Sequence, residues 1–197
     1  MDAPIVDLVH LLNSVPEYVT TSSCSGRVVL YAQKERRWLY VVHSECTTKQ
    51  IVSTCREYFE AAATAAPEEK TNRDDDDDDD EACTISPLSS SIGSSRVVLM
   101  KTEPFILHVL CRDVRSAQAL LQMSRDAGFR ESGISVGKKS IICAVRTTGN
   151  SMEVPLTSQL LQSDVGVPHL HFLSEYANDL FRKNSSRIRT FQELIVD

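Results

Sequence analysis

The sequence lacks the short motifs that mark the commonest nucleotide-binding folds. No GxGxxG follows a strand-like run, and no GxxxxGK[ST] is present. These absences exclude the Rossmann dinucleotide loop, the usual methyltransferase loop and the P-loop. HExxH is absent as well, so a zinc-protease helix is not indicated. The missing motifs leave the chemistry to be argued from other residues.

Cysteine pairs and long apolar runs are also missing. The six cysteines are scattered, and no two of them have CxxC spacing, which gives no indication of a zinc ribbon or a thioredoxin-type site. No apolar run approaches the roughly 20 residues that span a bilayer, and the first ten residues do not resemble a signal peptide. We therefore expect a cytoplasmic protein, with the nucleus as the other reducing compartment.

The charge is unevenly distributed. The net charge is -6, but the segment between Ala62 and Ser95 holds ten acidic and two basic residues, including seven consecutive aspartates at 74–80. Without this segment the chain carries +2, which permits an anionic partner without requiring one. An acidic, serine-rich run cannot bury apolar area, so we predict a disordered insertion at about 64–95 within a single domain of residues 1–197.

Hydrophobic periodicity predicts an α/β chain of the α+β type, with a mixed, largely antiparallel, non-Rossmann sheet covered by helices. Helices are expected at 4–14, 47–62, 113–127, from 168 onward and at 186–195. Strands are expected at 27–31, 38–43, 96–100, 104–111, 140–146 and 152–156. Residues 140–156 are interpreted as a hairpin turning at 147–151. Each half then holds a hairpin, which hints at an internal duplication, although the halves do not align.

The densest polar segment is TTSSCSGR, residues 20–27. In a loop, its hydroxyls and backbone N–H groups could hold a phosphate or carboxylate, Gly26 would allow close backbone approach, and Arg27 could form a bidentate clamp. An ordinary polar loop entering a strand is the alternative. Cys24 could be a nucleophile if a base lies nearby, although a structural thiol is the simpler interpretation.

Three other side chains are candidates for chemistry or stacking. His43 ends an apolar strand and could act as a general base near neutral pH. His108 lies inside an apolar strand, where a core histidine is more usual. Trp38 could stack on a nucleobase or pack in the core. The segment 181–189 carries Arg182, Lys183, Arg187 and Arg189, which form either a phosphate-contacting stripe or a solvated helix face.

Taken together, the motifs resemble a known family. YVTTSSCSGR, RWLYVVH, EPFILHV, GFRESGI, MEVPL, YAND and NSSRIRTF occur in this order across residues 4–192. This arrangement is similar to the wybutosine-synthesis methyltransferase family. The resemblance implies methyl transfer from S-adenosylmethionine to a ring nitrogen of a tricyclic guanosine derivative, beside the anticodon of phenylalanine tRNA, on a fold unlike the Rossmann fold. Family members usually carry a further stretch before the helix that begins here near Pro4.

The resemblance also implies a set of site residues. His43 is the expected base. The expected donor-binding residues are Ser22, Ser23, Cys24, Ser25, Gly26, Arg27, Ser132 and Gly133. The expected substrate-binding residues are Trp38, His108, Arg146, Glu153, Asn178 and Arg187. No metal is expected. Two alternatives stay open: a non-catalytic RNA-binding module on the same fold, and a thiol-dependent enzyme or redox sensor that uses Cys24, which predicts a low thiol pKa.

Overall fold

The computed structural model describes residues 2–64 and 96–196. It contains two four-stranded antiparallel sheets. Sheet A has the order β1-β5-β7-β6, with β1 at Tyr18–Cys24, β5 at Ile106–Cys111, β6 at Gly133–Val136 and β7 at Ile141–Arg146. Sheet B has the order β3-β2-β4-β8, with β2 at Arg27–Ala32, β3 at Arg37–Val42, β4 at Val98–Glu103 and β8 at Met152–Leu156. The predicted insertion lies outside the described residues, apart from Thr64.

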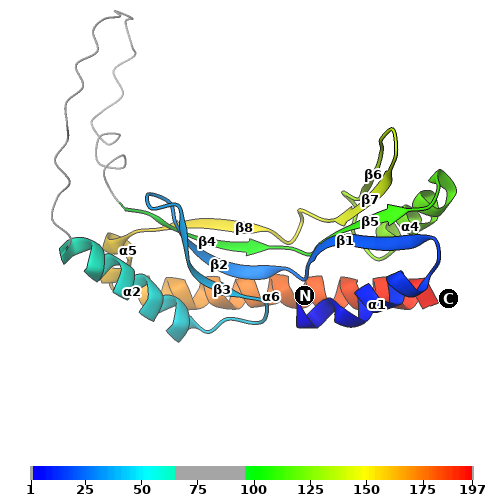
Figure 1. Ribbon diagram of the computed structural model, residues 1–197. Helices are drawn as coiled ribbons and strands as arrows, with labels where there is room; N and C mark the ends of the chain where they lie inside the picture. Colours follow the sequence, from blue (N-terminus) through cyan, green and yellow to red (C-terminus); the bar gives the residue numbers. More distant parts are fainter. Residues whose placement is uncertain (1, 65–95, 197) are drawn as a thin grey trace, which may run out of the picture.

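One long helix runs beneath both sheets. Helix α6 spans Gly166–Val196, and Figure 1 shows it as the common base of the molecule. Helix α1 (Val6–Ser14) and helix α4 (Val114–Asp126) pack with it around sheet A. Helix α2 (Thr48–Thr64) and the short α5 (Ser158–Gln162) pack with it near sheet B, and a 3-10 turn, η1 (Ala3–Ile5), precedes α1.

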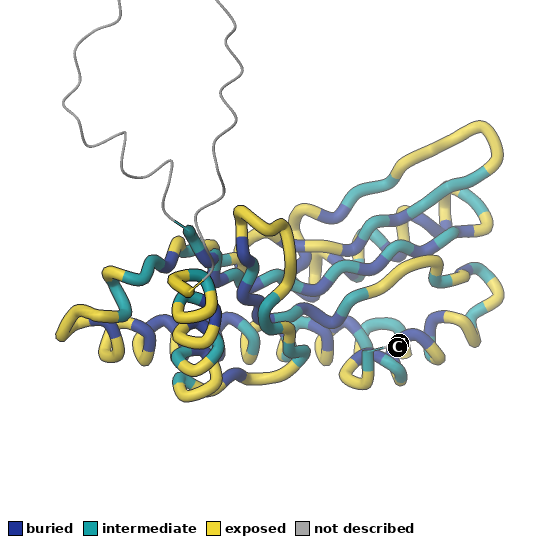
Figure 2. The backbone as a smooth tube through the Cα atoms, turned by 60° about the vertical axis from the view of Figure 1, so that its left-hand side comes forward, coloured by how far each residue is buried: buried dark blue, intermediate teal, exposed yellow. Residues whose placement is uncertain are grey.

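Two hydrophobic cores fill the space between the sheets and the helices. Under sheet A, strand residues such as Leu107 and Val109 pack against Ile188 and Phe191 of α6. A second core joins sheet B to α2 and the first half of α6. Burial alternates along the strands, as Figure 2 shows, because successive side chains of a strand point to opposite faces. Each sheet therefore has a face covered by helices and an open face.

The structure confirms most of the helices that periodicity predicted. Asp113 caps α4, since its carboxylate accepts from Ser116 N at 2.8 Å. Gly128 ends the following turn with φ +95°, in the left-handed region. Thr47 caps α2: its hydroxyl accepts from Gln50 N at 3.3 Å, and the Gln50 side chain accepts from Thr47 N at 3.2 Å. The two helical pieces expected after 168 are one continuous helix, α6.

The α+β class and the largely antiparallel pairing are confirmed, with the strands divided between two sheets. Two strand predictions were wrong. Residues 20–24 are not a loop, because they belong to β1, which pairs with β5. The expected hairpin at 140–156 does not form: β7 pairs with β5 and with the unpredicted β6, whereas β8 pairs with β4 in the other sheet. Both sheets thus combine strands from the two halves of the chain, so the halves are not independent repeats.

Three segments cross from one sheet to the other. Ser25–Gly26 joins β1 to β2, Pro104–Phe105 joins β4 to β5, and residues 147–151 join β7 to β8. The register places Cys24 opposite Ile106 in sheet A and Arg27 opposite Glu103 in sheet B, so the first two crossings run side by side. This junction gathers residues that are far apart in the sequence.

Candidate functional site

A pocket of about 290 Å³ lies at the junction between the sheets. It is lined by Cys24, Arg27, Glu103, Pro104, Phe105, Ile106, Arg146, Thr147 and Thr148. Each of the three crossing segments, or the strand ends beside it, contributes to this lining. Three residues expected from the sequence, Cys24, Arg27 and Arg146, are brought together here from β1, β2 and β7. We take this junction pocket as the candidate site.

Arg27 is held by a carboxylate and an aromatic ring. Its Nε donates to Glu103 Oε2 at 2.6 Å, and its guanidinium carbon lies 4.9 Å from the centroid of the Trp38 ring. Both partners of the ion pair remain about one third exposed, at 31% and 36%. A stacked, charge-paired guanidinium is fixed in orientation while its other N–H groups stay available. The pair thus presents a positive and a negative group side by side at the rim of the pocket.

Arg146 is positioned through its own backbone. Its N–H donates to Ser132 Oγ at 3.1 Å, and the Ser132 hydroxyl lies 3.4 Å from its carbonyl oxygen. The Arg146 Nε donates to the backbone carbonyl of Glu131 at 3.2 Å. Arg146 itself is exposed, whereas Ser132 is buried. Ser132, which is expected to contact the donor, thus hydrogen-bonds to the backbone of Arg146.

The turn at Ser25–Gly26 is fixed from beneath by α6. Gly26 has φ +94°, a conformation that glycine adopts without a Cβ clash. The buried Asn184 side chain donates to Ser25 O at 2.8 Å and accepts from Phe105 N at 3.0 Å. One amide therefore joins the β1–β2 crossing to the β4–β5 crossing, which sets the spacing of the two walls of the pocket.

His43 lies beside this turn, directly after β3. Its Nδ1 is 2.9 Å from Gly26 O, 3.2 Å from Asp2 Oδ2 and 4.0 Å from Cys24 Sγ. The imidazole is about one third exposed, at 32%. His43 does not line the junction pocket itself, but it contacts Cys24, which does.

The Cys24 thiol does not have the environment of an activated nucleophile. Burial raises its pKa, and the Asp2 carboxylate raises it further, whereas a backbone hydrogen bond and Arg27 act in the opposite direction. The pKa of the thiol is raised overall, so the thiol is protonated at neutral pH. The low thiol pKa that a Cys24-dependent enzyme requires is thus opposite to the direction in the structure.

Four other expected residues lie on sheet A, outside the lining of the junction pocket. Ser22 Oγ lies 2.8 Å from His108 Nδ1, and the two residues are directly opposite in the β1–β5 register. His108 is therefore paired on the open face and is not part of the core. Ser23 is exposed on β1, and Gly133 pairs with Ala144 with open space where a Cβ would be.

Other expected residues lie away from the pocket. Glu153 forms an ion pair with Lys101 at 2.9 Å on sheet B. Asn178 is buried. Its Oδ1 accepts from Cys46 N at 2.8 Å, and its Nδ2 donates to Cys46 O at 2.9 Å. In this position Asn178 orders the connection between β3 and α2, so we do not carry it into the proposed site.

The expected basic stripe on α6 is partly neutralised. Arg182 pairs with Glu45 at 2.9 Å, and Lys183 pairs with Asp179 at 2.7 Å. Arg187 differs, because it donates to Thr147 Oγ1 at 3.4 Å, and Thr147 lines the junction pocket. Of the stripe residues in these contacts, Arg187 is thus the one connected to the pocket.

Sequence reasoning assigned no role to three residues that shape the site. Glu103 and Asn184 lie within the quoted motifs EPFILHV and NSSRIRTF, but their partners become visible only in the fold. Asp2 has no local signal at all.

A further pattern, GISVG at 133–137, fits the GxSxG form, but its serine lies on β6 and not on a strand-to-helix turn, so it is not a nucleophile elbow.

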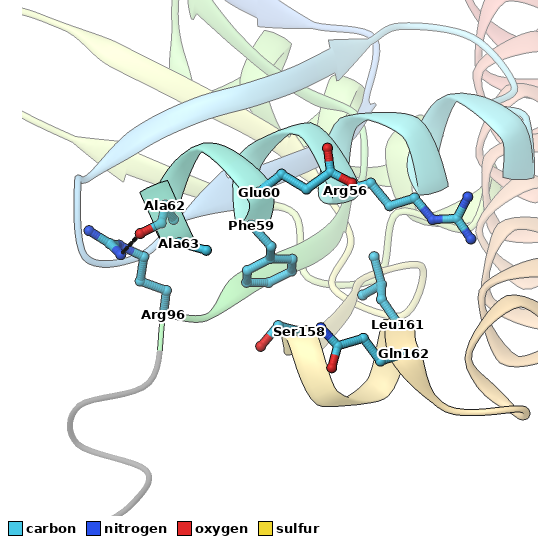
Figure 3. Close-up of a pocket in the computed structure, with 9 residues that line it drawn as sticks. All are labelled: Arg56, Phe59, Glu60, Ala62, Ala63, Arg96, Ser158, Leu161 and Gln162. Atoms are coloured by element: carbon cyan, nitrogen blue, oxygen red, sulfur yellow. Dashed lines mark hydrogen bonds between the residues drawn. The ribbon is translucent and has the colours of Figure 1, made fainter. Parts of the chain in front are cut away.

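A larger cavity lies elsewhere. It has a volume of about 650 Å³ and is formed by α2, α5 and Arg96, as Figure 3 shows. Arg96 closes one end by donating to Ala62 O at 2.6 Å. None of the residues expected to carry chemistry lines this cavity, so size alone does not make it the candidate site.

In the described parts of the chain, no helix is long and apolar enough to cross a membrane.

Comparisons with known proteins identify relatives along the whole chain. The model of the family described as Methyltransferase TYW3 matches residues 1–197. The chain is 34% identical to the tRNA wybutosine-synthesizing protein 3 homolog of Danio rerio and 35% identical to that of Xenopus laevis, over 99% of this chain and 66% of each relative. It is 30% identical to tRNA wybutosine-synthesizing protein 3 of Schizosaccharomyces pombe, over 98% of this chain and 75% of that protein. The chain thus spans just under two thirds of the two vertebrate relatives.

Solved structures show the same fold. The PH1069 protein from Pyrococcus horikoshii matches with a TM-score of 0.72 and 23% identity, over 98% of this chain and 82% of that one. A hypothetical protein from Aeropyrum pernix matches with a TM-score of 0.69 and 21% identity, over 98% and 96% of the two chains.

Proposed function

Because the chain belongs to the Methyltransferase TYW3 family, we propose that it is an S-adenosylmethionine-dependent tRNA methyltransferase of wybutosine synthesis. The proposed acceptor is a ring nitrogen of the tricyclic wybutosine precursor, beside the anticodon of phenylalanine tRNA. The names of the relatives support the tRNA and the wybutosine product. The motifs that carried the resemblance support the methyl donor and the acceptor nitrogen, because several of these motifs meet at the junction pocket.

The observation that carries the proposal is the Arg27–Glu103 pair at the rim of that pocket. The amino acid end of S-adenosylmethionine is a zwitterion, which requires a cationic group for its carboxylate and an anionic group for its ammonium. Arg27 and Glu103 offer both within one ion pair of 2.6 Å. The aminocarboxypropyl arm of the tRNA base carries the same two charges, so the pair could hold either one.

The size of the pocket fits one end of such a ligand. Small-molecule sites commonly measure about 300–1,000 Å³, and the junction pocket is at the lower limit with 290 Å³. We propose that a charged end enters the pocket while the remainder lies on the open faces of the sheets. Trp38, which is exposed to 47% and lies against Arg27, is proposed to stack on a ring there.

The remaining roles follow from this placement. The bound donor supplies an electrophilic methyl group, so the protein's main task is to align donor and acceptor. His43 is proposed as the base that takes the proton of the acceptor nitrogen. Arg146, which is exposed, and Arg187, beside Thr147, are proposed to contact phosphates of the tRNA. The polar side chains of Ser22, Ser23 and His108 are proposed to extend the binding face along sheet A.

The proposed location is the cytoplasm. All five described cysteines are free thiols, and four of them are buried. Free thiols are typical of a reducing compartment.

Calorimetry with S-adenosylmethionine tests the proposal. We expect binding in the micromolar range that Arg27→Ala weakens by at least tenfold, because the variant loses the cation beside Glu103. Arg37→Ala is the matched control, since Arg37 is an exposed arginine at the start of β3. Equal binding by both variants would move the donor away from the junction pocket. Tight tRNA binding without any donor binding would favour the non-catalytic RNA-binding module.

A further inference from the structure

The open face of sheet B carries two neighbouring aromatic rings. Tyr31 of β2 and Trp38 of β3 are directly opposite in the strand register, and their ring centroids lie 5.1 Å apart. Tyr31 follows Leu30, which belongs to the second core, so its ring points to the other side of the sheet, away from α6 (Figure 1). Trp38 is 47% exposed, and Tyr31 is half-buried. The two rings therefore form an apolar surface that faces solvent.

A cation lies over each ring. The Arg27 guanidinium carbon is 4.9 Å from the centroid of the Trp38 ring, and Lys101 Nζ is 5.7 Å from the centroid of the Tyr31 ring. Val29 lies between Arg27 and Tyr31 on the same side of β2, opposite Lys101, and it is fully buried. The rings and the stems of the two cations thus cover the sheet and hold one another in place.

Each cation is also paired with a carboxylate. Arg27 pairs with Glu103 at 2.6 Å, and Lys101 pairs with Glu153 at 2.9 Å. Two positive and two negative groups leave this surface without net charge, so it does not attract phosphates as a basic stripe does. A flat, neutral group whose edge carries both donors and acceptors matches it better, and nucleobases have these properties. We call this surface the aromatic face; its members are Arg27, Tyr31, Trp38, Lys101, Glu103 and Glu153.

The aromatic face continues from the junction pocket. Arg27 and Glu103 line the pocket, whereas Tyr31 lies four residues further along β2, roughly 13 Å from Arg27 at the usual rise of a strand. The ion pair at the rim is thus shared between the pocket and the face. A base held at the pocket has Trp38 and then Tyr31 beside it, so the next nucleotide of the same strand can reach the second ring.

We propose that the aromatic face binds unpaired nucleotides of RNA, with a nucleobase stacked on Tyr31 beside the base held at the junction pocket. This inference rests on the proposed function, because the RNA is the tRNA of that reaction. Four-stranded sheets that expose aromatic rings bind single-stranded RNA by such stacking in other folds. The bases of a duplex are already stacked and paired, so the face discriminates against double-stranded RNA. The methylated base is thereby selected through its unpaired neighbour.

The one tryptophan of the chain, Trp38, reports on this face directly. We expect a short unmodified RNA hairpin with an unpaired loop to quench the fluorescence of Trp38 in the full chain, in a saturable manner and without any methyl donor. A fully paired RNA duplex of the same length should cause little quenching at the same concentrations, because it has no base free to stack. Equal quenching by hairpin and duplex would overturn the inference, and so would a failure of the wild type to bind the hairpin.

Substitution of Tyr31 separates stacking from charge. Tyr31→Leu should weaken hairpin binding about 5- to 150-fold, the contribution of one stacked base, and Tyr31→Phe, which retains the ring, should bind within about twofold of wild type. Tyr176→Leu is the matched control, since Tyr176 is a 45% exposed tyrosine on α6. The dependence of affinity on salt concentration should be unchanged in Tyr31→Leu, because a stacked base releases no counterions, whereas Arg146→Ala should reduce it by about one phosphate contact.

The variants also distinguish a failure of this inference from a failure of the proposed function. A hairpin affinity of Tyr31→Leu within about twofold of wild type would overturn the inference alone, as would an equal loss in Tyr31→Phe or a reduced salt dependence in Tyr31→Leu. Conversely, loop-dependent quenching of Trp38 in a protein that transfers no methyl group would leave the inference standing and contradict the proposed function.

Discussion

The side-chain Nδ2 of Asn184 lies 2.9 Å from the position that a Cβ atom on Gly26 would occupy. The carbonyl oxygen of Glu103 lies 3.0 Å from the same point. The turn between the sheets is thus enclosed by α6 on one side and by the β4–β5 crossing on the other. Residue 26 has no room for a side chain, and its φ of +94° disfavours one independently.

We expect Gly26→Ala to destabilise the fold by about 1–3 kcal/mol, because alanine is strained at this φ and its methyl group meets backbone and amide atoms. Chemical denaturation measures the change. Gly149→Ala is the matched control, since a Cβ there would meet only Thr147 Oγ1 at 3.7 Å. Equal stabilities of the two variants would contradict the enclosed turn.

Removal of the Asn184 amide should cost more. Asn184→Ala leaves the Ser25 carbonyl and the Phe105 N–H without their partner, at about 1–3 kcal/mol for each buried group. Thermal unfolding with the neighbouring Ser185→Ala as control checks this, because the Ser185 hydroxyl donates within its own helix, to Phe181 O. A loss below 1 kcal/mol for Asn184→Ala would show that the two crossings do not depend on this residue.

The helices were predictable from the sequence because their signals are local. An apolar residue every three or four positions, Asp113 before α4 and Gly128 after it define both the element and its ends. The strands were less predictable, because which strand pairs with which depends on distant residues. The polar residues 20–24 suggested a loop, but they form β1 at the edge of sheet A, where polar side chains can face solvent.

The site was only partly predictable for the same reason. Arg27 and Arg146 are recognisable as isolated cations, and motif resemblance selects both. Their meeting at one pocket depends on β1 and β7 both pairing with β5, which brings together residues far apart in the sequence. Asp2 belongs to no motif, and its contacts with Ser25 and His43 become visible only in the fold.

The Cys24 thiol should react slowly with alkylating reagents. Burial and the Asp2 carboxylate raise its pKa, so little thiolate is present at pH 7.5. Iodoacetamide labelling followed by peptide mapping should show slower modification of Cys24 in the folded protein than in the same protein in denaturant. Faster labelling in the folded state would revive the thiol-dependent alternative.

Alkaline stability should depend on Tyr58. Its hydroxyl donates to Glu35 Oε2 at 2.5 Å, and burial, together with this carboxylate, raises the pKa of Tyr58 to about 12. A pKa raised by folding stabilises the folded state fully below about pH 10, the ordinary value, and this stability is lost as the pH rises through about 12. The loss should be roughly 2–3 kcal/mol.

Denaturation of wild type and Tyr58→Phe at successive pH values measures this contribution. The stability difference between the two proteins should be constant from pH 7 to 9 and should then shrink or reverse toward pH 12. A difference that stays constant over the whole range would contradict the Tyr58–Glu35 bond.

Single-turnover transfer of a labelled methyl group from S-adenosylmethionine to phenylalanine tRNA carrying the wybutosine precursor tests the central claim most directly. The wild type should methylate the precursor. His43→Ala should slow transfer about 10²- to 10⁴-fold, the usual contribution of a general base, while its donor and tRNA affinities stay within a few-fold of wild type. Transfer at the wild-type rate by His43→Ala would rule out His43 as the base, and no transfer by a wild type that binds both ligands would contradict the methyltransferase assignment itself.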